Sequence, residues 1–307
     1  MLDWGIYSMN DNLDFEKRLE IASKNIHRRE IQLDINSEVA MANNMILHSA
    51  SNLNLVEMKL LRFIIMQTKK GDEEFYEFEI SMNDIANTLE MNVDYLYREM
   101  DDMTTHIMQE VIFIGDGSNR QWIKFHWVDT CRYEDGKITI KISDELKPFL
   151  IGLRGSFTRY ALSEITSMNS IYAIRIYEIL NGYMNDNNLP HADVGIEISI
   201  SIDTIRKATD TVNSYQRYSS FKTYVIDNAV KEINRCSKYH VTATPYKHGR
   251  SVAGFDFLIE SQAGYAHRIG NQSSKKKSIG RVDIKKDGQM NLMDYQTSDN
   301  KFIITKE

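Results

Sequence analysis

Apolar residues recur at helical spacing in the first part of the chain. The strongest such stripe runs over Leu55–Met66, and Asn54 followed by Glu57 has the pattern of a capping box. After a charged turn, apolar and acidic residues alternate over Tyr76–Ile80, which predicts a strand. The pattern therefore opens with a well-defined helix and a half-buried strand.

Two more helices follow this strand. Ser81 is a good N-cap for a short helix, and Val93–Ile107 predicts a second helix after a tight turn. Glu110–Ile114 and Gln121–Trp127 predict a hairpin around a turn that contains two glycines, with a further strand at Lys137–Ile142. A helix-turn-helix followed directly by a hairpin has the element order of a winged helix.

The same order recurs in the second half. A long helix, a strand, a helix-turn-helix and two alternating strands are expected at Met168–Tyr183, Gly195–Ile200, Ser201–Ala208, Tyr215–Cys236, Val241–Tyr246 and Val252–Ile259. The repeat lies in the order of elements rather than in residue identity, and its period of about 110 to 120 residues implies two like domains. The expected fold class is α+β, with two winged-helix domains in tandem.

The pattern divides the chain into four parts. Residues 1–38 are expected to form an N-terminal arm, and residues 39–154 and 155–261 the first and second winged-helix domains. Residues 262–307 form a basic tail that is rich in lysine and serine. This tail is too polar to fold alone, so we expect it to be disordered at least through Lys286.

The composition provides ample material for a core, since 42% of the 307 residues are apolar and 26% are charged. The chain has no apolar run long enough for a transmembrane helix, and its start lacks the pattern of a signal peptide. Cys131 and Cys236 lie far apart, which fits a reducing compartment. We therefore expect a cytoplasmic protein with no membrane partner.

The charge is unevenly distributed. A net charge of −6 would argue against nucleic acid as a partner, but binding responds to the local field. Residues 72–110 include twelve acidic residues and a single Lys or Arg, Arg98. Residues 203–260 include nine Lys and Arg residues and six acidic residues. Residues 262–286 include seven further Lys and Arg residues and one acidic residue, Asp283. Positive charge is therefore concentrated in the second half.

Known signatures of catalytic and metal sites are missing from the sequence. It has no glycine-rich phosphate loop, its eight histidines never stand at metal-ligand spacing, and its two cysteines make no C-x-x-C. Asp101 and Asp102 are neighbours on a helix and are interpreted as a solvated face. We therefore expect no enzymatic activity, no catalytic residues, no metal site and no cofactor.

The start of the last long helix collects groups that bond phosphates or base edges. These groups belong to Tyr215, Gln216, Arg217, Ser219, Ser220, Lys222 and Thr223. A helix-turn-helix reads DNA with this end of its second helix. Lys247, His248 and Arg250 cluster at the tip of the following hairpin, where they would suit phosphate contacts. The alternatives are an ordinary amphipathic helix and an ordinary polar hairpin tip.

An ordered set of motifs covers roughly Val39 to Glu260. It comprises Asn54–Leu61, Trp122–Trp127, Phe157–Leu162, Tyr172–Glu178, Ser214-Tyr-Gln-Arg217, Phe221 and Glu232-Ile-Asn234 ahead of the basic hairpin. Together these motifs resemble the plasmid replication initiator family. Members of that family are theta-type initiators that bind iterons, the direct repeats at plasmid origins.

The resemblance implies two winged helices in a pseudo-two-fold relation, of which the second makes the main sequence-specific contacts in the major groove. It implies that Arg217 reads a base and that Thr223, where relatives often carry arginine, is a second reading position. The first domain has an acidic recognition helix, so Arg120, Lys124 and Arg132 around its hairpin are better candidates for DNA contact. The family's first domain also forms a dimer interface.

These features predict a plasmid replication initiator that binds double-stranded origin repeats, promotes origin opening and recruits host replication proteins. Its expected partners are origin DNA, the host initiator, the replicative helicase and a second copy, with a homodimer in equilibrium with monomer. One alternative is a transcriptional regulator with the same tandem winged helices. Another is a protein-interaction module, which the acidic first domain favours.

Overall fold

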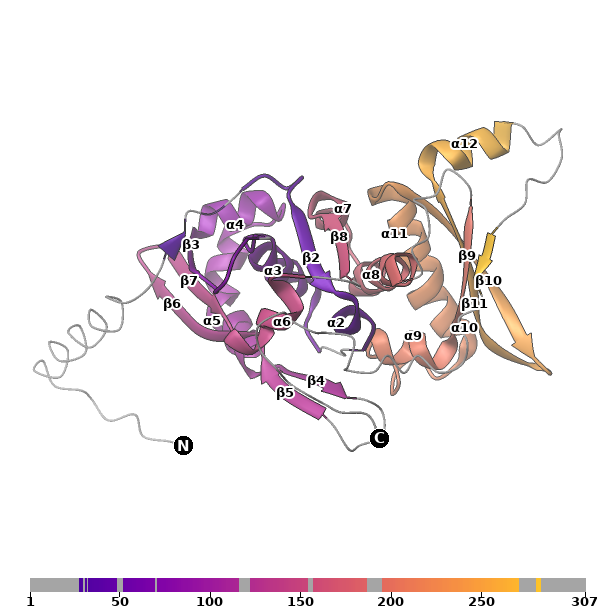
Figure 1. The fold of residues 1–307 in the computed structure, drawn as a ribbon, viewed down its shortest axis with the longest axis horizontal. Coiled ribbons are helices and arrows are strands. Elements are labelled where there is room, and N and C mark those ends of the chain that lie inside the picture. The colour runs from indigo at the N-terminus through magenta and orange to yellow at the C-terminus, as the bar shows by residue number, and fades with distance from the viewer. Residues whose placement is uncertain are drawn as a thin grey trace, which may run out of the picture.

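The computed structural model describes residues 28–29, 31, 33–48, 52–69, 71–115, 122–153, 157–186, 195–270 and 280–282. Two halves with the same order of elements lie next to each other along the long axis of the molecule (Figure 1). Each half is a winged helix. The expected α+β class and the tandem arrangement are therefore confirmed. Residues 1–27 of the expected N-terminal arm lie outside the described residues, and so does the domain boundary expected between residues 154 and 155.

The first winged helix has a three-stranded sheet packed on a helix-turn-helix. Its elements are α3 (Leu55–Met66), β3 (Glu77–Ser81), α4 (Met82–Thr88), α5 (Val93–Gln109), β6 (Val128–Glu134) and β7 (Lys137–Ile142), followed by the short helices η1 (Asp144–Leu146) and α6 (Lys147–Leu150). Strand β7 pairs antiparallel with both β3 and β6. The short strand β1 (Arg28–Arg29) adds to the sheet parallel to β3, so the end of the expected arm belongs to this domain.

The second winged helix repeats this plan. Its elements are α8 (Ile171–Asp186), β9 (Ile196–Ser201), α9 (Ile202–Ala208), α10 (Tyr218–Phe221), a π-helical segment η2 (Lys222–Asp227), α11 (Asn228–Cys236), β10 (Tyr239–His248) and β11 (Ser251–Ser261). Strand β11 pairs antiparallel with both β9 and β10, as β7 does with β3 and β6. Helices α10 and α11 continue through η2 and form the recognition helix of this domain.

Local sequence signals set the ends of the helices. The Asn54 side chain accepts the amide N–H groups of residues 56 and 57, and Glu57 Oε2 accepts the Asn54 N–H at 2.7 Å, so the capping box is confirmed. Ser81 caps α4 as expected. After α4 and α9 the chain turns through Glu90 and Asp210, which have φ values of 54° and 50°. Non-glycine residues rarely adopt this left-handed backbone, so the shared turn is a structural signature of the repeat.

The hairpin expected as the first wing is a separate element. Strands β4 (Val111–Gly115) and β5 (Trp122–His126) pair only with each other within the described part of the chain, whereas β6 and β7 occupy the wing position. Asp135 and Gly136 form the tight turn between β6 and β7, with φ values of 47° and 75°. The prediction was wrong because two hairpins follow α5 in succession, and only the second one pairs with β3.

A small sheet joins the two halves. Strand β2 (Glu38–Ala42) pairs antiparallel with β8 (Phe157–Ala161), with Ala40 opposite Arg159. Through α2 (Asn43–His48), β2 leads to α3, and through α7 (Ser163–Thr166), β8 leads to α8. An antiparallel pair has a local two-fold axis, and equivalent helices follow its two strands, which fits the expected pseudo-two-fold relation of the winged helices. Their sheets consequently lie at opposite ends of the molecule (Figure 1).

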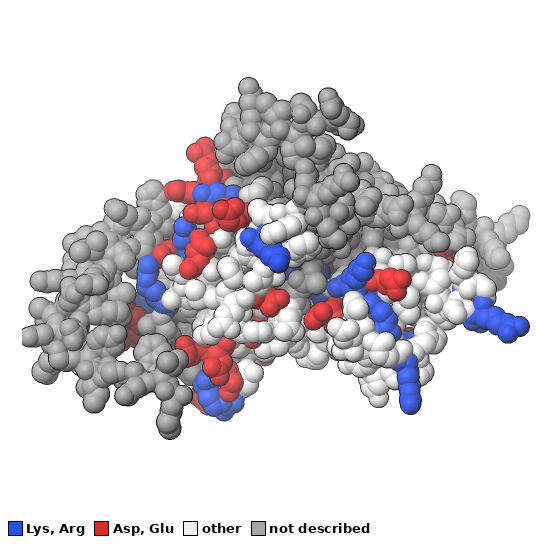
Figure 2. Space-filling view, turned by 90° about the horizontal axis from the view of Figure 1, so that it is seen from below, with Lys and Arg blue, Asp and Glu red and all other residues white. Residues whose placement is uncertain are grey.

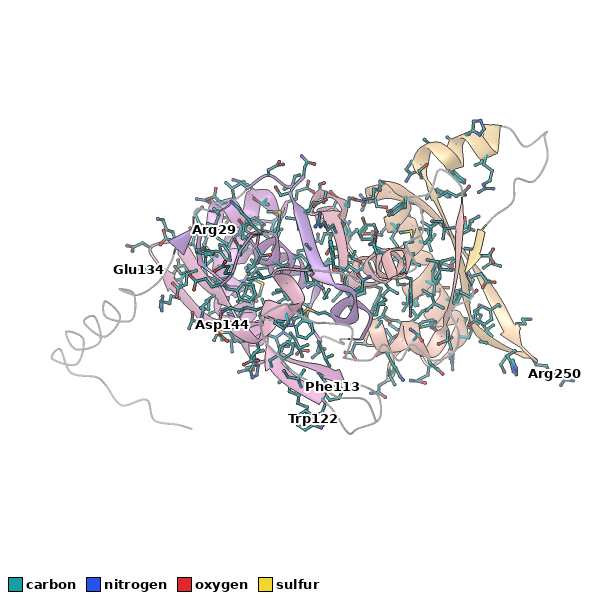
Figure 3. The ribbon with its side chains drawn as sticks, viewed as in Figure 1. Arg29, Phe113, Trp122, Glu134, Asp144 and Arg250 are labelled. Carbon is teal, nitrogen blue, oxygen red and sulfur yellow. The ribbon has the colours of Figure 1, made fainter. Side chains whose placement is uncertain are left out.

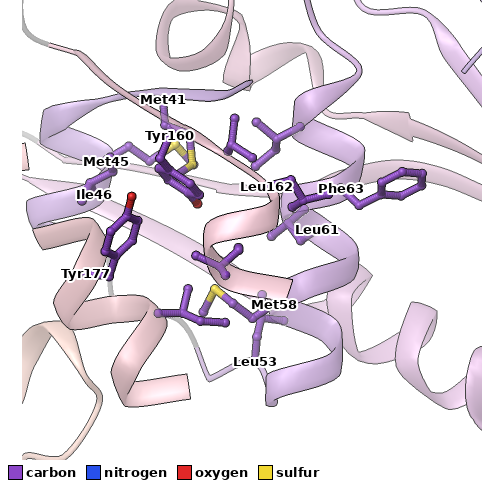
Figure 4. Packing of buried hydrophobic residues seen from close by; sticks show 14 of the residues in the cluster. Met41, Met45, Ile46, Leu53, Met58, Leu61, Phe63, Tyr160, Leu162 and Tyr177 are labelled. Carbon is purple, nitrogen blue, oxygen red and sulfur yellow. The ribbon is translucent and has the colours of Figure 1, made fainter. Parts of the chain in front are cut away.

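Apolar side chains fill the space between the halves (Figure 4). Met41 and Met45 come from β2 and α2, and Leu61 comes from α3. Tyr160 on β8 and Tyr177 on α8 pack edge to face with ring centroids 5.4 Å apart. These residues belong to one cluster of buried side chains that extends through both winged helices. Burial of this shared apolar surface holds the two domains together.

A carboxylate is buried in the same region. Glu178 on α8 is fully buried and accepts hydrogen bonds from Arg62 Nε at 2.6 Å and from Tyr160 Oη at 2.6 Å. Arg175 Nη1 donates a further bond at 3.0 Å, and its Nη2 donates to the Ile46 carbonyl oxygen of the first half. Burial alone would raise the pKa of Glu178, but the two guanidinium groups outweigh it and hold the pKa below its ordinary value.

The start of the expected disordered tail is folded. Helix α12 covers Gln262–Gly270, and strand β12 (Gly280–Val282) pairs parallel with β9. Gln262 Nε2 donates to three carbonyl oxygens at the end of α11 and the start of β10, and the Tyr265 ring stacks on His240. The prediction was wrong here because these contacts come from the second domain, and a local measure of polarity cannot detect them.

Replacement of Glu178 tests the buried cluster. Glu178→Gln keeps the size of the side chain but leaves two buried guanidinium groups without a counter-charge, so the free energy of unfolding should fall by about 3–5 kcal/mol. The lowered pKa of Glu178 predicts that wild-type stability is lost as the pH falls through that pKa, and the variant should lack this contribution. Urea denaturation between pH 3 and pH 7 measures both effects, with Glu99→Gln in an exposed ion pair as the control. Equal loss in the two variants would contradict the assigned role.

Candidate nucleic-acid interface

The loop before the recognition helix of the second domain is fixed by Arg206. Its guanidinium donates to the carbonyl oxygens of Thr211, Ser214 and Tyr215 at 2.7 to 2.8 Å, and it lies over the Phe221 ring at 4.2 Å from the centroid. Tyr215 adopts a left-handed backbone with φ of 50°. The loop therefore has a defined shape that positions the start of the helix.

The recognition helix begins at Tyr218, so the expectation of a helix from Tyr215 is wrong. Arg217 is the N-cap residue with extended backbone, where we expected it inside the first turn. The reason is the bonding of the loop carbonyls to Arg206, which holds residues 211–215 outside the helix. Arg217 nevertheless lies at the N-terminal end of the helix, is exposed, and has no ion-pair partner in the described part of the chain.

The helix is amphipathic as expected. Its buried side carries Phe221, Val225, Ile226, Ala229 and Ile233. Of the candidate binding residues, Gln216, Ser219 and Thr223 are exposed, and Ser220 and Lys222 are half-buried. Two of them already have partners, because Gln216 Nε2 donates to the Val212 carbonyl oxygen and Lys222 Nζ bonds both carboxylate oxygens of Asp227 at 2.7 Å. Tyr215 is half-buried against Tyr172, so the structure gives it a packing role.

The wing of the second domain is the hairpin that the sequence predicts. Gly249 turns its tip with φ of 64°, and the strand pairing shifts register between Tyr246 and Lys247. At its base, a side chain at Gly254 would collide with the Ile200 carbonyl oxygen and the Tyr246 ring, so glycine is required there. Three candidate residues occupy the tip, and none has an ion-pair partner in the described part of the chain: Lys247, His248 and Arg250.

The corresponding surface of the first domain is acidic. Helix α5 exposes Asp94, Asp101 and Asp102, and its single arginine, Arg98, pairs with the neighbouring Glu99 at 2.6 Å. The wing turn contains Asp135 after Glu134. Glu134 and Arg250 mark the two wings, at opposite ends of the molecule (Figure 3). The two winged helices therefore present opposite charge on equivalent elements.

Basic residues of the first domain are mostly paired. Arg132 on β6, a candidate for DNA contact, bonds Glu77 at 3.0 Å, and Lys137 bonds Glu79 at 2.8 Å. Figure 2 shows that Lys and Arg extend to solvent at the second-domain end, whereas at the other end they are interspersed with Asp and Glu. Arg120, another candidate, lies outside the described residues.

Lys124 lies on the outer face of the β4–β5 hairpin. Its ammonium group is 5.2 Å from the centroid of Trp122 and 5.9 Å from that of Phe113. Trp122 and Phe113 are 57% and 44% exposed as residues, and Val111 on the same face is 43% exposed. Figure 3 shows both rings on the hairpin, which projects from the body of the first domain. This apolar outer face, formed by Val111, Phe113 and Trp122, is typical of an interaction surface.

Tyr224 is a further exposed residue of the recognition helix, and no motif in the sequence marks it. Its side chain is 59% exposed on the recognition helix next to Thr223. The available signal is its position outside the apolar stripe of that helix, where a large aromatic residue does not belong to the core. Among the described residues, no group of three His, Cys, Asp or Glu side chains could hold a metal ion. In that part of the chain, no helix is both long and apolar enough to span a bilayer.

Comparison with known proteins finds a matching family model for each half of the chain. One family model, described as initiator replication protein, WH1, matches residues 38–181, and another, described as initiator Rep protein, WH2, matches residues 201–259. A curated relative, a replication initiation protein from Escherichia coli, is 22% identical over 178 residues, which cover 58% of this chain and 54% of the relative. The chain thus matches about half the length of that relative.

A solved structure shares the fold. The Pi initiator protein, crystallised in complex with iteron DNA, matches with a TM-score of 0.61 at 16% sequence identity. The match covers 75% of this chain and 99% of that chain. The arrangement of two winged helices in one chain is therefore shared with a protein of known structure.

Proposed function

Because the chain belongs to the initiator replication protein family, we propose that it is a plasmid replication initiator that binds direct repeats at an origin. The second winged helix makes the sequence-specific contacts. The chain acts by binding rather than by catalysis, in the cytoplasm, and its bound form promotes opening of the adjacent DNA. The Pi initiator, which shares the fold, is a protein that binds iteron DNA.

The observation that carries this proposal is the contrast between the two domains. Arg217, Lys247 and Arg250 are exposed at the recognition helix and wing of the second domain without ion-pair partners in the described residues. On the equivalent elements of the first domain, Arg98 and Arg132 are already paired with carboxylates. Cations without partners on a surface that a fold presents to DNA favour phosphate and base contacts.

The geometry suggests how a duplex is held. The N-terminal end of the recognition helix enters the major groove, where the Arg217 guanidinium can bond the O6 and N7 atoms of guanine in a fork. The wing residues Lys247 and Arg250 lie at the tip of the β10–β11 hairpin, which projects at Arg250 (Figure 3), and contact the phosphates beside the groove. Arg206 keeps the intervening loop in place without touching DNA.

The first domain serves a different partner in this proposal. Acidic side chains on α5 disfavour phosphate, whereas the β4–β5 hairpin exposes Phe113 and Trp122. We place the contact with a second copy of the chain on this hairpin, with a homodimer in equilibrium with monomer. The host initiator and the replicative helicase are the further partners of the DNA-bound form.

Two experiments separate this proposal from its alternatives. A transcriptional regulator with the same fold would bind DNA but would not support replication of an origin fragment when it is supplied in trans. A protein-interaction module would not shift a repeat-containing fragment in a salt-dependent manner. Footprinting on DNA next to the gene identifies the fragment for both experiments.

The wing contributes phosphate contacts in this proposal. Replacement of Lys247 and Arg250 with alanine removes two cations, so the slope of the logarithm of the binding constant against the logarithm of salt concentration should fall by about 2. Affinity should fall similarly on specific and random duplexes. Titration at several salt concentrations measures the slope, and the double variant Lys137→Ala with Lys141→Ala in the first domain is the control. An unchanged slope would mean that the wing does not touch DNA.

Arg217 contributes base recognition. Arg217→Ala should cost about 1–3 kcal/mol on the cognate repeat and little on random DNA. Arg217→Lys keeps the charge but loses the planar fork, so it should recover non-specific binding more than selectivity. Competition with single-base variants of the repeat should locate the loss at one guanine.

Thermal melting provides the control for Arg217. The melting temperature of Arg217→Ala should stay at the wild-type value, because the side chain has no partner in the described part of the chain. Arg206→Ala should melt earlier, since it leaves three loop carbonyl oxygens without their donor. A uniform loss of Arg217→Ala on every DNA variant would argue against base recognition.

The hairpin determines self-association. Replacement of Phe113 and Trp122 with serine removes the exposed apolar surface, so the dimer should dissociate at concentrations where the wild type is dimeric. Sedimentation velocity at several concentrations measures the equilibrium. Tyr133→Ser, at a residue of similar exposure on β6, is the control. An unchanged dimer fraction in the double variant would place the interface elsewhere.

A further inference from the structure

The recognition helix of the second domain differs from its counterpart in one segment. Helix α5 of the first domain is a continuous α-helix of 17 residues, whereas the six residues of η2, between α10 and α11, are π-helical. A π-helix is wider than an α-helix, is rare, and occurs frequently at functional sites. Because the first domain builds the same fold without such a segment, the fold does not require it.

The π-helical segment decides which side chains face outward. Val225 and Ile226 are consecutive and both fully buried. Lys222 and Asp227 form an ion pair across five positions, which is the spacing that a π-helical turn brings together. The adjacent residues Thr223 and Tyr224 are consequently exposed together on the other side of the helix.

The Tyr224 side chain packs against another tyrosine but is otherwise exposed to solvent. Its ring centroid lies 5.9 Å from that of Tyr215, which in turn packs edge to face on Tyr172 at 5.9 Å. Burial raises the pKa of Tyr172 to about 12, so its hydroxyl stays neutral and the tyrosine against which Tyr215 packs carries no charge. The Tyr224 hydroxyl makes no hydrogen bond within the described residues. An aromatic side chain that is already oriented loses little conformational freedom when it binds a partner.

We propose that Tyr224 contacts the C5-methyl group of a thymine in the major groove and so helps to determine which repeat the protein selects. This inference rests on the proposed function, because it places the same helix in the groove. The thymine methyl is the apolar group on the major-groove edges of the bases, and apolar side-chain contacts discriminate it. A phosphate is a poorer partner for Tyr224, because the Asp227 carboxylate lies one turn away and would repel it. The nearby Lys222 ammonium group is already paired with that carboxylate.

Replacement of thymine with deoxyuridine tests the contact, because it removes only the methyl group. Full-length protein first selects a duplex from a random-sequence pool, and each thymine of that duplex is then replaced in turn. Wild-type affinity should fall about fourfold at one position, which corresponds to the loss of one buried methyl group. Tyr224→Ala should bind the thymine and uracil forms of that position equally. Tyr224→Phe should keep the wild-type difference.

The matched control is Tyr97→Ala, at an exposed tyrosine on the recognition helix of the first domain. It should keep the wild-type sensitivity to deoxyuridine. Thermal melting checks that each variant is folded, and Tyr224→Gln takes the place of Tyr224→Ala if the latter melts early.

Two results would overturn the inference. In one, no thymine position is sensitive in the wild type. In the other, Tyr224→Ala is weakened on all duplexes but keeps the methyl sensitivity, which would place the ring on the sugar-phosphate backbone. Failure of the wild type to select any sequence from the pool would instead contradict the proposed function, so the two failures are distinguishable.

Discussion

The carboxylate of Glu178 is buried where the two winged helices meet, and both of them supply its partners. Arg62 reaches it from α3 and Arg175 from α8, while Arg175 also bonds a carbonyl oxygen of α2. Arg62 and Glu178 are each the eighth residue of their helices, so the pseudo-two-fold brings equivalent positions together with opposite charge. A relative movement of the domains would leave at least one buried charge without its partner, which is costly. This network therefore fixes the orientation of both recognition helices.

Once the orientation is fixed, differences between the two copies of the fold decide what each does. The second domain connects its recognition helix directly to its wing, whereas the first inserts the β4–β5 hairpin between them. Since the second domain folds without this insertion, the hairpin is an addition to the fold, and its outer face exposes Phe113 and Trp122. The domain with the acidic recognition helix is thus also the domain with an added apolar surface, which fits a protein partner better than a nucleic acid.

Much of the fold follows from local sequence signals, because each is read over a few residues. The capping box at Asn54 and Glu57, the Ser81 cap and the basic second wing are examples, and the family resemblance is confirmed by the matching family models. The errors arise where distant residues decide. Which hairpin becomes the first wing depends on pairing with β3, and the start of the recognition helix depends on Arg206. The ion pairs of Arg132 and Lys222 likewise cannot be predicted from the sequence, because they depend on which carboxylate lies nearby in the fold.

The net charge of −6 does not conflict with a DNA-binding surface, because charge acts locally. At physiological ionic strength the screening length is about 8 Å, which is much less than the diameter of a folded protein of this size. The acidic wing turn near Glu134 and the basic tip at Arg250 lie at opposite ends of the molecule, so the first is screened from a duplex held at the second (Figure 3). Within that range, the local field at the basic tip favours phosphate, and the local field at the acidic wing turn disfavours it. The charge distribution thus favours the proposed contact of a duplex with the second domain over one with the first.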